Sequence, residues 1–338
     1  MADPAGSRVI AVAGTSHSPM VTLDPGIIWP ARALVDVTNP GLYDTTGVIR
    51  TYDELVAEAA GRFDRELDRG AWAAKHGLAL ASIERLGRDI LALEPDLVIA
   101  VGDDQKEMYD FDNFPSLSVY YGAEIKIVPP PSREPTLPHE REVRLMQGLD
   151  GSTHPGDAEA ARRIITGLMA RDFDVAAGNK IRDHGPHQGF GHAVAFVLVR
   201  LLKSAAIPCV PVLLNTYYPP NQPSPRRCVD LGNAIALAVR TLPGNRRAVV
   251  IASGGLSHFV VDTELDTRLL EGMRSGDLQA LAALPAGRMN SGTSEGRNWL
   301  VAAGAGGAEG LKHQWSEYVP AYRSPAGTGT GLAFGLWA

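Results

Sequence analysis

The chain has few cysteines, no basic stripe and no long apolar run. Its 338 residues include two cysteines, Cys209 and Cys228, which are too few for a disulfide framework and typical of a reducing compartment. No apolar run reaches about 18 residues, so we expect no membrane span. Residues 1–8 lack the apolar core of a signal peptide. The predicted location is therefore cytoplasmic, with no membrane partner.

The charge balance argues against nucleic acid as a partner. Lysine and arginine number 32 against 38 aspartates and glutamates, a formal net charge of −6. A protein that binds the phosphate backbone usually presents clustered positive charge, which is absent from this sequence. The content of 45% hydrophobic and 21% charged residues is typical of a globular protein. We find no repeat, low-complexity segment or linker, so one domain over residues 1–338 is predicted.

Common cofactor motifs are also missing. The sequence has no Gly-x-Gly-x-x-Gly after an apolar run and no P-loop, which argues against a nucleotide cofactor. It has no His-Glu-x-x-His motif and no paired Cys-x-x-Cys, which gives no support to a standard zinc protease or a structural zinc site.

Four short apolar runs predict buried strands, and each one leads directly into a polar cluster. Segments with helical periodicity lie between them, so the pattern indicates an α/β fold with a largely buried central sheet flanked by helices. In such sheets, ligands bind at the carboxyl edge of the strands. The predicted strands are residues 9–13, 97–101, 207–214 and 248–252, with a further candidate at 117–121.

The remaining segments are assigned from helical spacing and from turn residues. Residues 23–47 are rich in Pro, Gly and Asn and are interpreted as irregular structure, pinned to the core by Ile28 and Trp29. The tail from residue 318 onward is rich in Gly and Pro, with Phe334 and Trp337 as anchors. Thr293 is interpreted as an N-cap. The predicted helices are residues 52–67, 71–93, 158–170, 193–202, 226–242, 265–284 and 297–303.

Histidines and carboxylates follow several of the predicted strands. His17 comes just after the first strand, on a loop that Gly14 and Pro19 delimit. Taken alone, it is more typical of a hydrogen-bonded loop histidine than of a metal ligand. Residues 103–107 (Asp-Asp-Gln-Lys-Glu) follow the second strand, and His258 follows the fourth. Gathered at one edge, such groups suit a non-haem metal.

The motifs resemble those of a known family. They are residues 15–19 (TSHSP), 102–107 (GDDQKE), 191–193 (GHA), 215–223 (NTYYPPNQP), 253–258 (SGGLSH) and 292–299 (GTSEGRNW). Taken in order, they resemble the class III extradiol ring-cleavage dioxygenases, the group of the protocatechuate 4,5-dioxygenase catalytic subunit. The closest likeness is to the 3-O-methylgallate dioxygenase branch.

The resemblance implies an α/β protein with a mononuclear Fe(II). It implies that His17 is one iron ligand and that Glu295 is the carboxylate ligand. The family's second histidine ligand ends an Asn-Asp-His motif, and here Gln105 stands at that position. An amide oxygen coordinates more weakly than imidazole. Glu107 and Asp103 are therefore alternatives for the third ligand.

The resemblance also implies catalytic roles for histidines outside the ligand set. His192 matches the family's acid/base residue, although a histidine at a helix start can also bond backbone groups. His184 and His187 are alternatives in the same loop. His258 is expected either to hydrogen-bond the substrate or a ligand, or to support the structure.

Other residues of these motifs are assigned less specific roles. Tyr217, Tyr218 and Asn221 either shape an aromatic pocket or stiffen their loop. Arg323 either meets a substrate carboxylate or makes a surface pair.

Together these expectations describe an Fe(II)-dependent dioxygenase that cleaves the ring of a small carboxylated catechol with O₂. Substrates such as 3-O-methylgallate, gallate or protocatechuate fit that class. Two alternatives are kept: a metal-dependent hydrolase with the same ligands, and a non-catalytic protein on this fold that binds a metal or a partner. A homodimer is expected.

Overall fold

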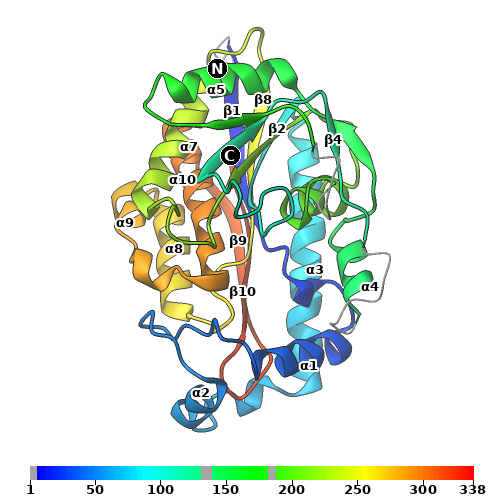
Figure 1. The fold of residues 1–338 in the computed structure, drawn as a ribbon, viewed down its shortest axis with the longest axis vertical. Helices are drawn as coiled ribbons and strands as arrows, with labels where there is room; N and C mark the ends of the chain where they lie inside the picture. The colour runs from blue at the N-terminus through cyan, green and yellow to red at the C-terminus, as the bar shows by residue number, and fades with distance from the viewer. Residues whose placement is uncertain (1–5, 131–138, 182–187) are drawn as a thin grey trace.

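A mixed β-sheet runs through the centre of the molecule (Figure 1). The computed structural model describes residues 6–130, 139–181 and 188–338. Within that part of the chain the main sheet has eight strands, and a separate ribbon pairs β4 (Glu124–Lys126) with β5 (Thr153–Pro155). In spatial order the main strands are β6 (Ala176–Gly178), β3 (Leu117–Tyr120), β7 (Cys209–Leu214), β2 (Leu97–Asp103), β8 (Arg247–Ser253), β1 (Arg8–Thr15), β10 (Gly329–Trp337) and β9 (His313–Tyr322).

The four central strands, β7, β2, β8 and β1, are parallel to one another. Their carboxyl ends therefore meet at one edge of the sheet, as the sequence predicts. Each of the four corresponds to one of the predicted apolar runs, and the candidate strand at 117–121 is β3. The central α/β sheet is confirmed.

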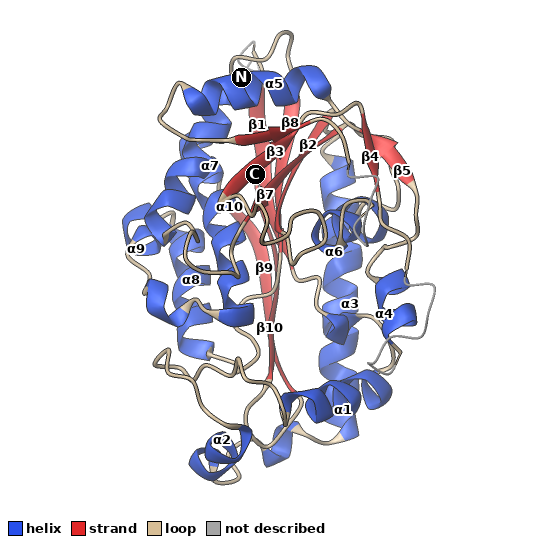
Figure 2. Ribbon diagram, in the orientation of Figure 1, coloured by secondary structure: helices blue, strands red, loops and turns tan. Residues whose placement is uncertain are grey.

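Helices cover both faces of this sheet (Figure 2). One layer contains α7 and α10, with α5, α8 and α9 packed around them; the other contains α3, with α1, α4 and α6 on the same side. The helices are α1 (Pro25–Asp36), α2 (Tyr52–Ala59), α3 (Arg69–Ala92), α4 (Glu140–Met146), α5 (Ala158–Met169), α6 (His192–Ala195), α7 (Pro225–Val239), α8 (Thr263–Ser275), α9 (Leu278–Ala282) and α10 (Gly296–Glu309). No described helix is long and apolar enough to cross a membrane.

The burial of β2 shows why its sequence is apolar from Leu97 to Val101. Successive side chains of a strand point to opposite faces. Leu97, Ile99 and Val101 pack into the core beneath α7 and α10, whereas Val98 and Ala100 pack into the core beneath α3. Since both faces are covered, this part of the strand is apolar on both sides, and the first buried polar side chain, Asp103, comes only at its carboxyl end.

Two segments differ from their predicted structure. Residues 25–36, expected to be irregular, form α1, because Asp24 caps the helix and Pro25 occupies its first turn, where a missing N–H costs nothing. Ile28 and Trp29 are buried, as predicted. The glycine-rich tail forms the β9–β10 hairpin, and β10 joins the sheet antiparallel to β1. Its glycines alternate with buried Leu332 and Phe334, so the strand pattern is present but diluted.

Several predicted helices have different ends. The segment 52–67 is helical only to Ala59, 193–202 continues α6 as a π-helical turn, Phe196–Leu201, and 265–284 is divided between α8 and α9 at Gly276. Thr293 is not an N-cap. It lies in a 3-10 turn, Ser291–Glu295, where its hydroxyl bonds both backbone groups of His258.

We predict that Gly14→Ala destabilises the fold by about 1–3 kcal/mol, the usual cost of overpacking. A Cβ at Gly14 would lie 2.3 Å from the Trp299 ring, which packs flat against β1. Thermal or denaturant unfolding measures the change. Gly77→Ala is the matched control, because a Cβ there, inside α3, meets nothing within 4 Å. Its midpoint should be unchanged or higher; equal losses in both variants would contradict this interpretation.

Candidate metal centre

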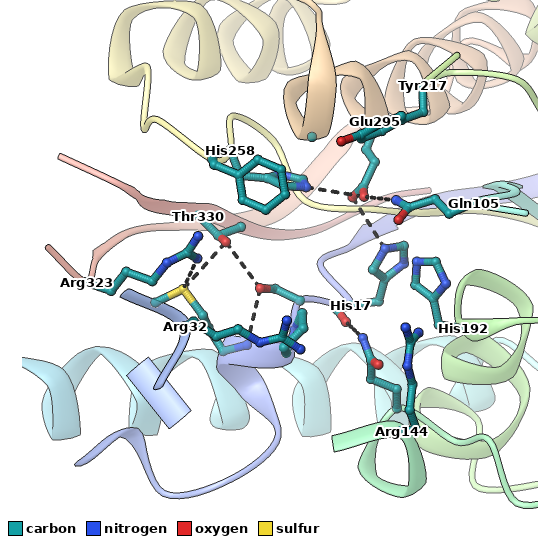
Figure 3. A pocket seen from close by; sticks show the side chains of 16 residues that line it. His17, Arg32, Gln105, Arg144, His192, Tyr217, His258, Glu295, Arg323 and Thr330 are labelled. Carbon is teal, nitrogen blue, oxygen red and sulfur yellow. Dashed lines mark hydrogen bonds and ion pairs between the residues drawn. The ribbon is translucent and has the colours of Figure 1, made fainter. Parts of the chain in front are cut away.

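Four buried side chains converge at the carboxyl edge of the central strands. His17, Asp103, His192 and Glu295 each offer one ligand atom, and these atoms all lie within 4.8 Å of one another. The four residues are only 1–5% exposed. Figure 3 shows three of them, His17, His192 and Glu295, beside Gln105. Histidine nitrogens and carboxylate oxygens at this spacing make a candidate site for a divalent metal.

His17 lies on the loop just after β1, and both its imidazole and its backbone are held by hydrogen bonds. Its Nδ1 lies 3.0 Å from the hydroxyl of Ser253 at the end of β8, and its backbone carbonyl accepts a bond from Gln147 Nε2 at 2.8 Å. The buried Nε2 has no hydrogen-bond partner among the described residues. A proton on Nδ1, shared with Ser253, leaves the Nε2 lone pair directed at the cluster.

Glu295 ends the 3-10 turn before α10 and is tied to the loop after β8. The backbone N–H of Gly255 donates to its Oε2 at 2.7 Å. Its two oxygens lie 3.4 Å from His17 Nε2 and 3.3 Å from His258 Nε2. Burial raises the pKa of this carboxyl, but the neighbouring His258 and His17 outweigh burial and hold the pKa well below its ordinary value. Glu295 is therefore an anion inside the protein.

A second buried carboxylate, Asp103, ends β2. Gln105 joins it to Glu295, since its Nε2 donates to Asp103 Oδ2 at 3.0 Å and to Glu295 Oε1 at 3.2 Å. Burial and the charge of Glu295 raise the pKa of Asp103. Two carboxylates at such close range repel each other unless a proton or a cation lies between them. The Gln105 side chain thus faces the cluster, and rotating its amide by 180° exchanges oxygen for nitrogen.

His192, at the start of α6, is paired with Glu107 and not with Glu295, the carboxylate of the expected ligand set. Glu107 Oε1 lies 2.7 Å from His192 Nδ1 and also accepts the His192 backbone N–H at 3.0 Å. Burial lowers the pKa of His192, but the charge of Glu107 outweighs burial and raises this pKa to about 9. In turn, His192 lowers the pKa of the Glu107 carboxyl to about 2. Gly191 permits this approach, because a Cβ there would lie 1.9 Å from the Glu107 carboxyl carbon.

His258 contacts the cluster from the loop after β8. Its Nδ1 lies 2.9 Å from the carbonyl of Leu256, which can only accept, so this nitrogen carries a proton. Its Nε2 faces Glu295, whose charge outweighs burial and raises the pKa of His258. His258 therefore supports Glu295 and at the same time lines the adjoining cavity.

A cavity of about 160 Å³ opens from the cluster. An apolar cavity of roughly 150 Å³ is known to hold benzene, so the space suits one aromatic ring. Most of the residues that line it are polar or charged. They are His17, Ser18, Pro19, Met20, Arg32, Gln105, Arg144, Gln147, His192, Tyr217, His258, Phe259, Gly292, Glu295, Arg323 and Thr330.

The structure brings together most of the residues that the sequence singled out. His17, Gln105, His192, His258 and Glu295 all line the cavity. His184 and His187 lie outside the described residues.

Of the loop after β7, Tyr217 lines the cavity, whereas Asn221 braces the loop through Asn215 and the Phe114 carbonyl. Tyr218 packs against Phe111 and Phe114.

Arg323 makes no surface pair; it is buried and bonded to Asp36 at 2.7 and 2.8 Å. Sequence reasoning missed Arg32, Arg144 and Gln147, which lie in or beside helices and carry no motif. It considered Glu107 only as a ligand, although the structure shows it bonded to His192.

Fold and site together define an α/β protein with a buried histidine–carboxylate centre at the carboxyl edge of its parallel strands, next to a cavity the size of one ring. The chain belongs to the family described as the catalytic LigB subunit of aromatic ring-opening dioxygenase, whose profile matches residues 71–333. That match includes Asp103, Gln105, His192 and Glu295; His17 precedes it.

Two relatives carry specific names. The chain is 30% identical over 187 residues to a 2,3-dihydroxyphenylpropionate/2,3-dihydroxicinnamic acid 1,2-dioxygenase from Burkholderia vietnamiensis, covering 53% of this chain and 49% of that protein. It is 28% identical over 176 residues to a gallate dioxygenase from Pseudomonas putida, covering 49% of this chain and 50% of that protein. The chain thus spans about half the length of the curated relatives it matches.

We predict that Glu107→Gln lowers the pKa of His192 from about 9 in the metal-free protein. Removing the carboxylate charge leaves burial as the main influence, and burial disfavours imidazolium. A histidine NMR titration measures the change. His154, which bonds Ser152 instead, provides an internal control whose pKa should not move. An unchanged His192 titration would show that Glu107 does not set its protonation.

Proposed function

We propose that the chain is an Fe(II)-dependent extradiol dioxygenase, a single catalytic domain over residues 1–338 that cleaves a small carboxylated catechol with O₂. The observation that carries the proposal is the unpartnered, buried Nε2 of His17, which faces two buried carboxylates beside a cavity of ring size. Family membership and the two named relatives support the reaction class.

The donor set fits a divalent cation. His17 Nε2 and a Glu295 oxygen would hold the metal, and its positive charge would offset the repulsion between Glu295 and Asp103. The third ligand is either the Gln105 amide oxygen or an Asp103 oxygen. Glu107 is not included, because its carboxylate is bonded to His192.

Fe(II) would supply a common binding point for two ring hydroxyls and O₂, and a path for electrons between them. His192 would exchange the proton of a ring hydroxyl at Nε2 while Glu107 holds its Nδ1 proton. His258 would steady Glu295 and offer its ring to the substrate oxygens. Burial of the cluster would keep bulk water away from these transfers.

The substrate class follows from the cavity and from the relatives. One ring fills the space, and the names of both relatives specify hydroxylated aromatic acids. A 3-O-methylgallate, gallate or protocatechuate-like compound fits this description. The expected homodimer and cytoplasmic location stay predictions from sequence.

The deciding experiment loads the protein with Fe(II) under anaerobic conditions and then follows O₂ uptake and ultraviolet-visible spectra against a panel of catechols. One O₂ consumed for each ring opened would support the proposal. Hydrolysis of an ester or amide without O₂ uptake would favour the metal-dependent hydrolase, and bound metal without turnover of any compound would favour a non-catalytic role.

We predict that His17→Ala and Glu295→Ala each abolish Fe(II) retention, since each removes one ligand from a small set. Metal analysis of the purified variants, with circular dichroism as a check of folding, measures the outcome. Stoichiometric iron in either folded variant would remove that residue from the ligand set.

The third ligand is decided by titrating Fe(II) into three variants. If Gln105 coordinates, Gln105→Ala weakens iron binding and Gln105→His tightens it, because imidazole is the stronger donor. We expect this result, together with partial iron loss during purification that added Fe(II) restores. Unchanged affinity in Gln105→Ala, with loss in Asp103→Ala, would assign the position to the carboxylate.

We predict that His192→Ala keeps iron and binds substrate but loses turnover by roughly 10²–10⁴-fold, the usual contribution of a positioned acid/base. Metal analysis measures the iron content, anaerobic titration measures substrate binding, and O₂ uptake at saturating concentration of the best substrate of the panel measures the turnover number. A turnover number near that of the wild type would end this assignment.

A further inference from the structure

The cavity has a second polar end, formed by Arg32 of α1 and Arg144 of α4. Glu140 connects them: its Oε2 accepts from Arg32 Nη2 at 3.2 Å, and its Oε1 accepts from Arg144 Nε at 2.7 Å. Figure 3 shows both arginines beside the cavity, on the other side of His17 from Glu295. One carboxylate thus orients two guanidinium groups and neutralises only one of them.

Both guanidinium groups keep donors to spare. Each carries five N–H donors. Among the described residues, Arg32 hydrogen-bonds only Glu140, and Arg144 adds a single ion-pair contact of 3.8 Å to Glu107, which is already bonded to His192. Their side chains are 20% and 33% exposed, so a ligand in the cavity can reach them. An anion could bind here without displacing Glu140.

The third arginine of the cavity is different. Arg323 is buried, and its Nε and Nη2 both donate to the carboxylate of Asp36, which balances its charge. The pKa of Arg32 is lowered: burial lowers it most, and Arg323 and Arg144 add to this effect against the opposing Glu140. Among the described residues, the positive charge without its own counter-ion therefore lies at Arg32 and Arg144, where an anionic group would be stabilised.

We propose that Arg32 and Arg144 bind the carboxylate of the aromatic substrate and so determine specificity for ring acids. The inference rests on the proposed function, because hydroxyls at the metal centre would direct the rest of the ring toward the arginine end. Planar guanidinium groups suit a carboxylate, since each can form two parallel charge-assisted bonds with it.

The test uses 3,4-dihydroxybenzoate and its methyl ester, which share a ring and both hydroxyls but differ in charge. Binding to the Fe(II)-loaded protein is measured anaerobically by calorimetry, and KM is measured in air. In Arg32→Met and Arg144→Met we expect affinity for the acid to fall about 10- to 100-fold, the usual effect of losing a charged hydrogen bond. Affinity for the ester should change less than twofold.

Two further variants guard against trivial explanations. Arg32→Lys keeps the positive charge but loses the planar, two-pronged guanidinium group. Its affinity for the acid should lie between that of the wild type and that of Arg32→Met. Arg163→Met, at an exposed pair with Glu159 on α5, should leave both affinities unchanged. Equal losses for acid and ester, or no loss for the acid, would overturn the proposal.

Failure of the proposed function gives a different pattern. If wild type cleaves neither ring, benzoate, which has the carboxylate but no hydroxyls, is titrated into the metal-free protein. Binding that disappears in Arg32→Met and Arg144→Met would support the anion site on its own. Absence of benzoate binding, or binding that both variants retain, would overturn it.

Discussion

The whole site depends on two carboxylates, Asp103 and Glu295, buried at the edge of the same sheet. Charges of one sign in a space without water are tolerated only when protons, donors or a cation compensate them. The chain supplies donors from three directions: the Gly255 backbone, the Gln105 amide and the His258 ring. The Nε2 of His17, which has no hydrogen-bond partner among the described residues, faces the same two carboxylates.

This concentration of polar groups requires small residues next to them. Gly191 leaves room for Glu107 to bond both the backbone and the ring of His192. Gly14 lets Trp299 lie against β1, and the Trp299 indole N–H then donates to the carbonyl of Gly254 at 2.9 Å. Core packing and the position of the site loop are therefore coupled through one aromatic ring.

The cavity is electrically asymmetric. Glu295 and the histidines of the candidate metal site line one part of it, and Arg32 and Arg144, both bonded to Glu140, line another. A ligand with hydroxyls at one end and a carboxylate at the other matches both ends at once, whereas the reversed orientation would place its carboxylate against Glu295. Under the proposed function, this distribution of charge would favour one orientation of such a molecule.

Sequence by itself determined the parts that depend on local pattern. The apolar runs at 97–101 and 248–252 specify buried parallel strands, because side chains on both faces must be apolar. The motifs around His17, Gln105, His192, His258 and Glu295 identified residues that the fold does bring together. Only the tertiary structure decided the rest.

Contacts between distant segments leave no local signature. Arg32 and Arg144 are 112 positions apart, in helices without a motif, and become one feature only when Glu140 bonds both. Glu107 and His192 likewise meet only in the folded chain. The sequence did not predict strand β10, because its glycines interrupt the alternation of apolar and polar residues that marks a strand. Its position beside β1 depends on pairing between distant strands, which the sequence pattern does not show.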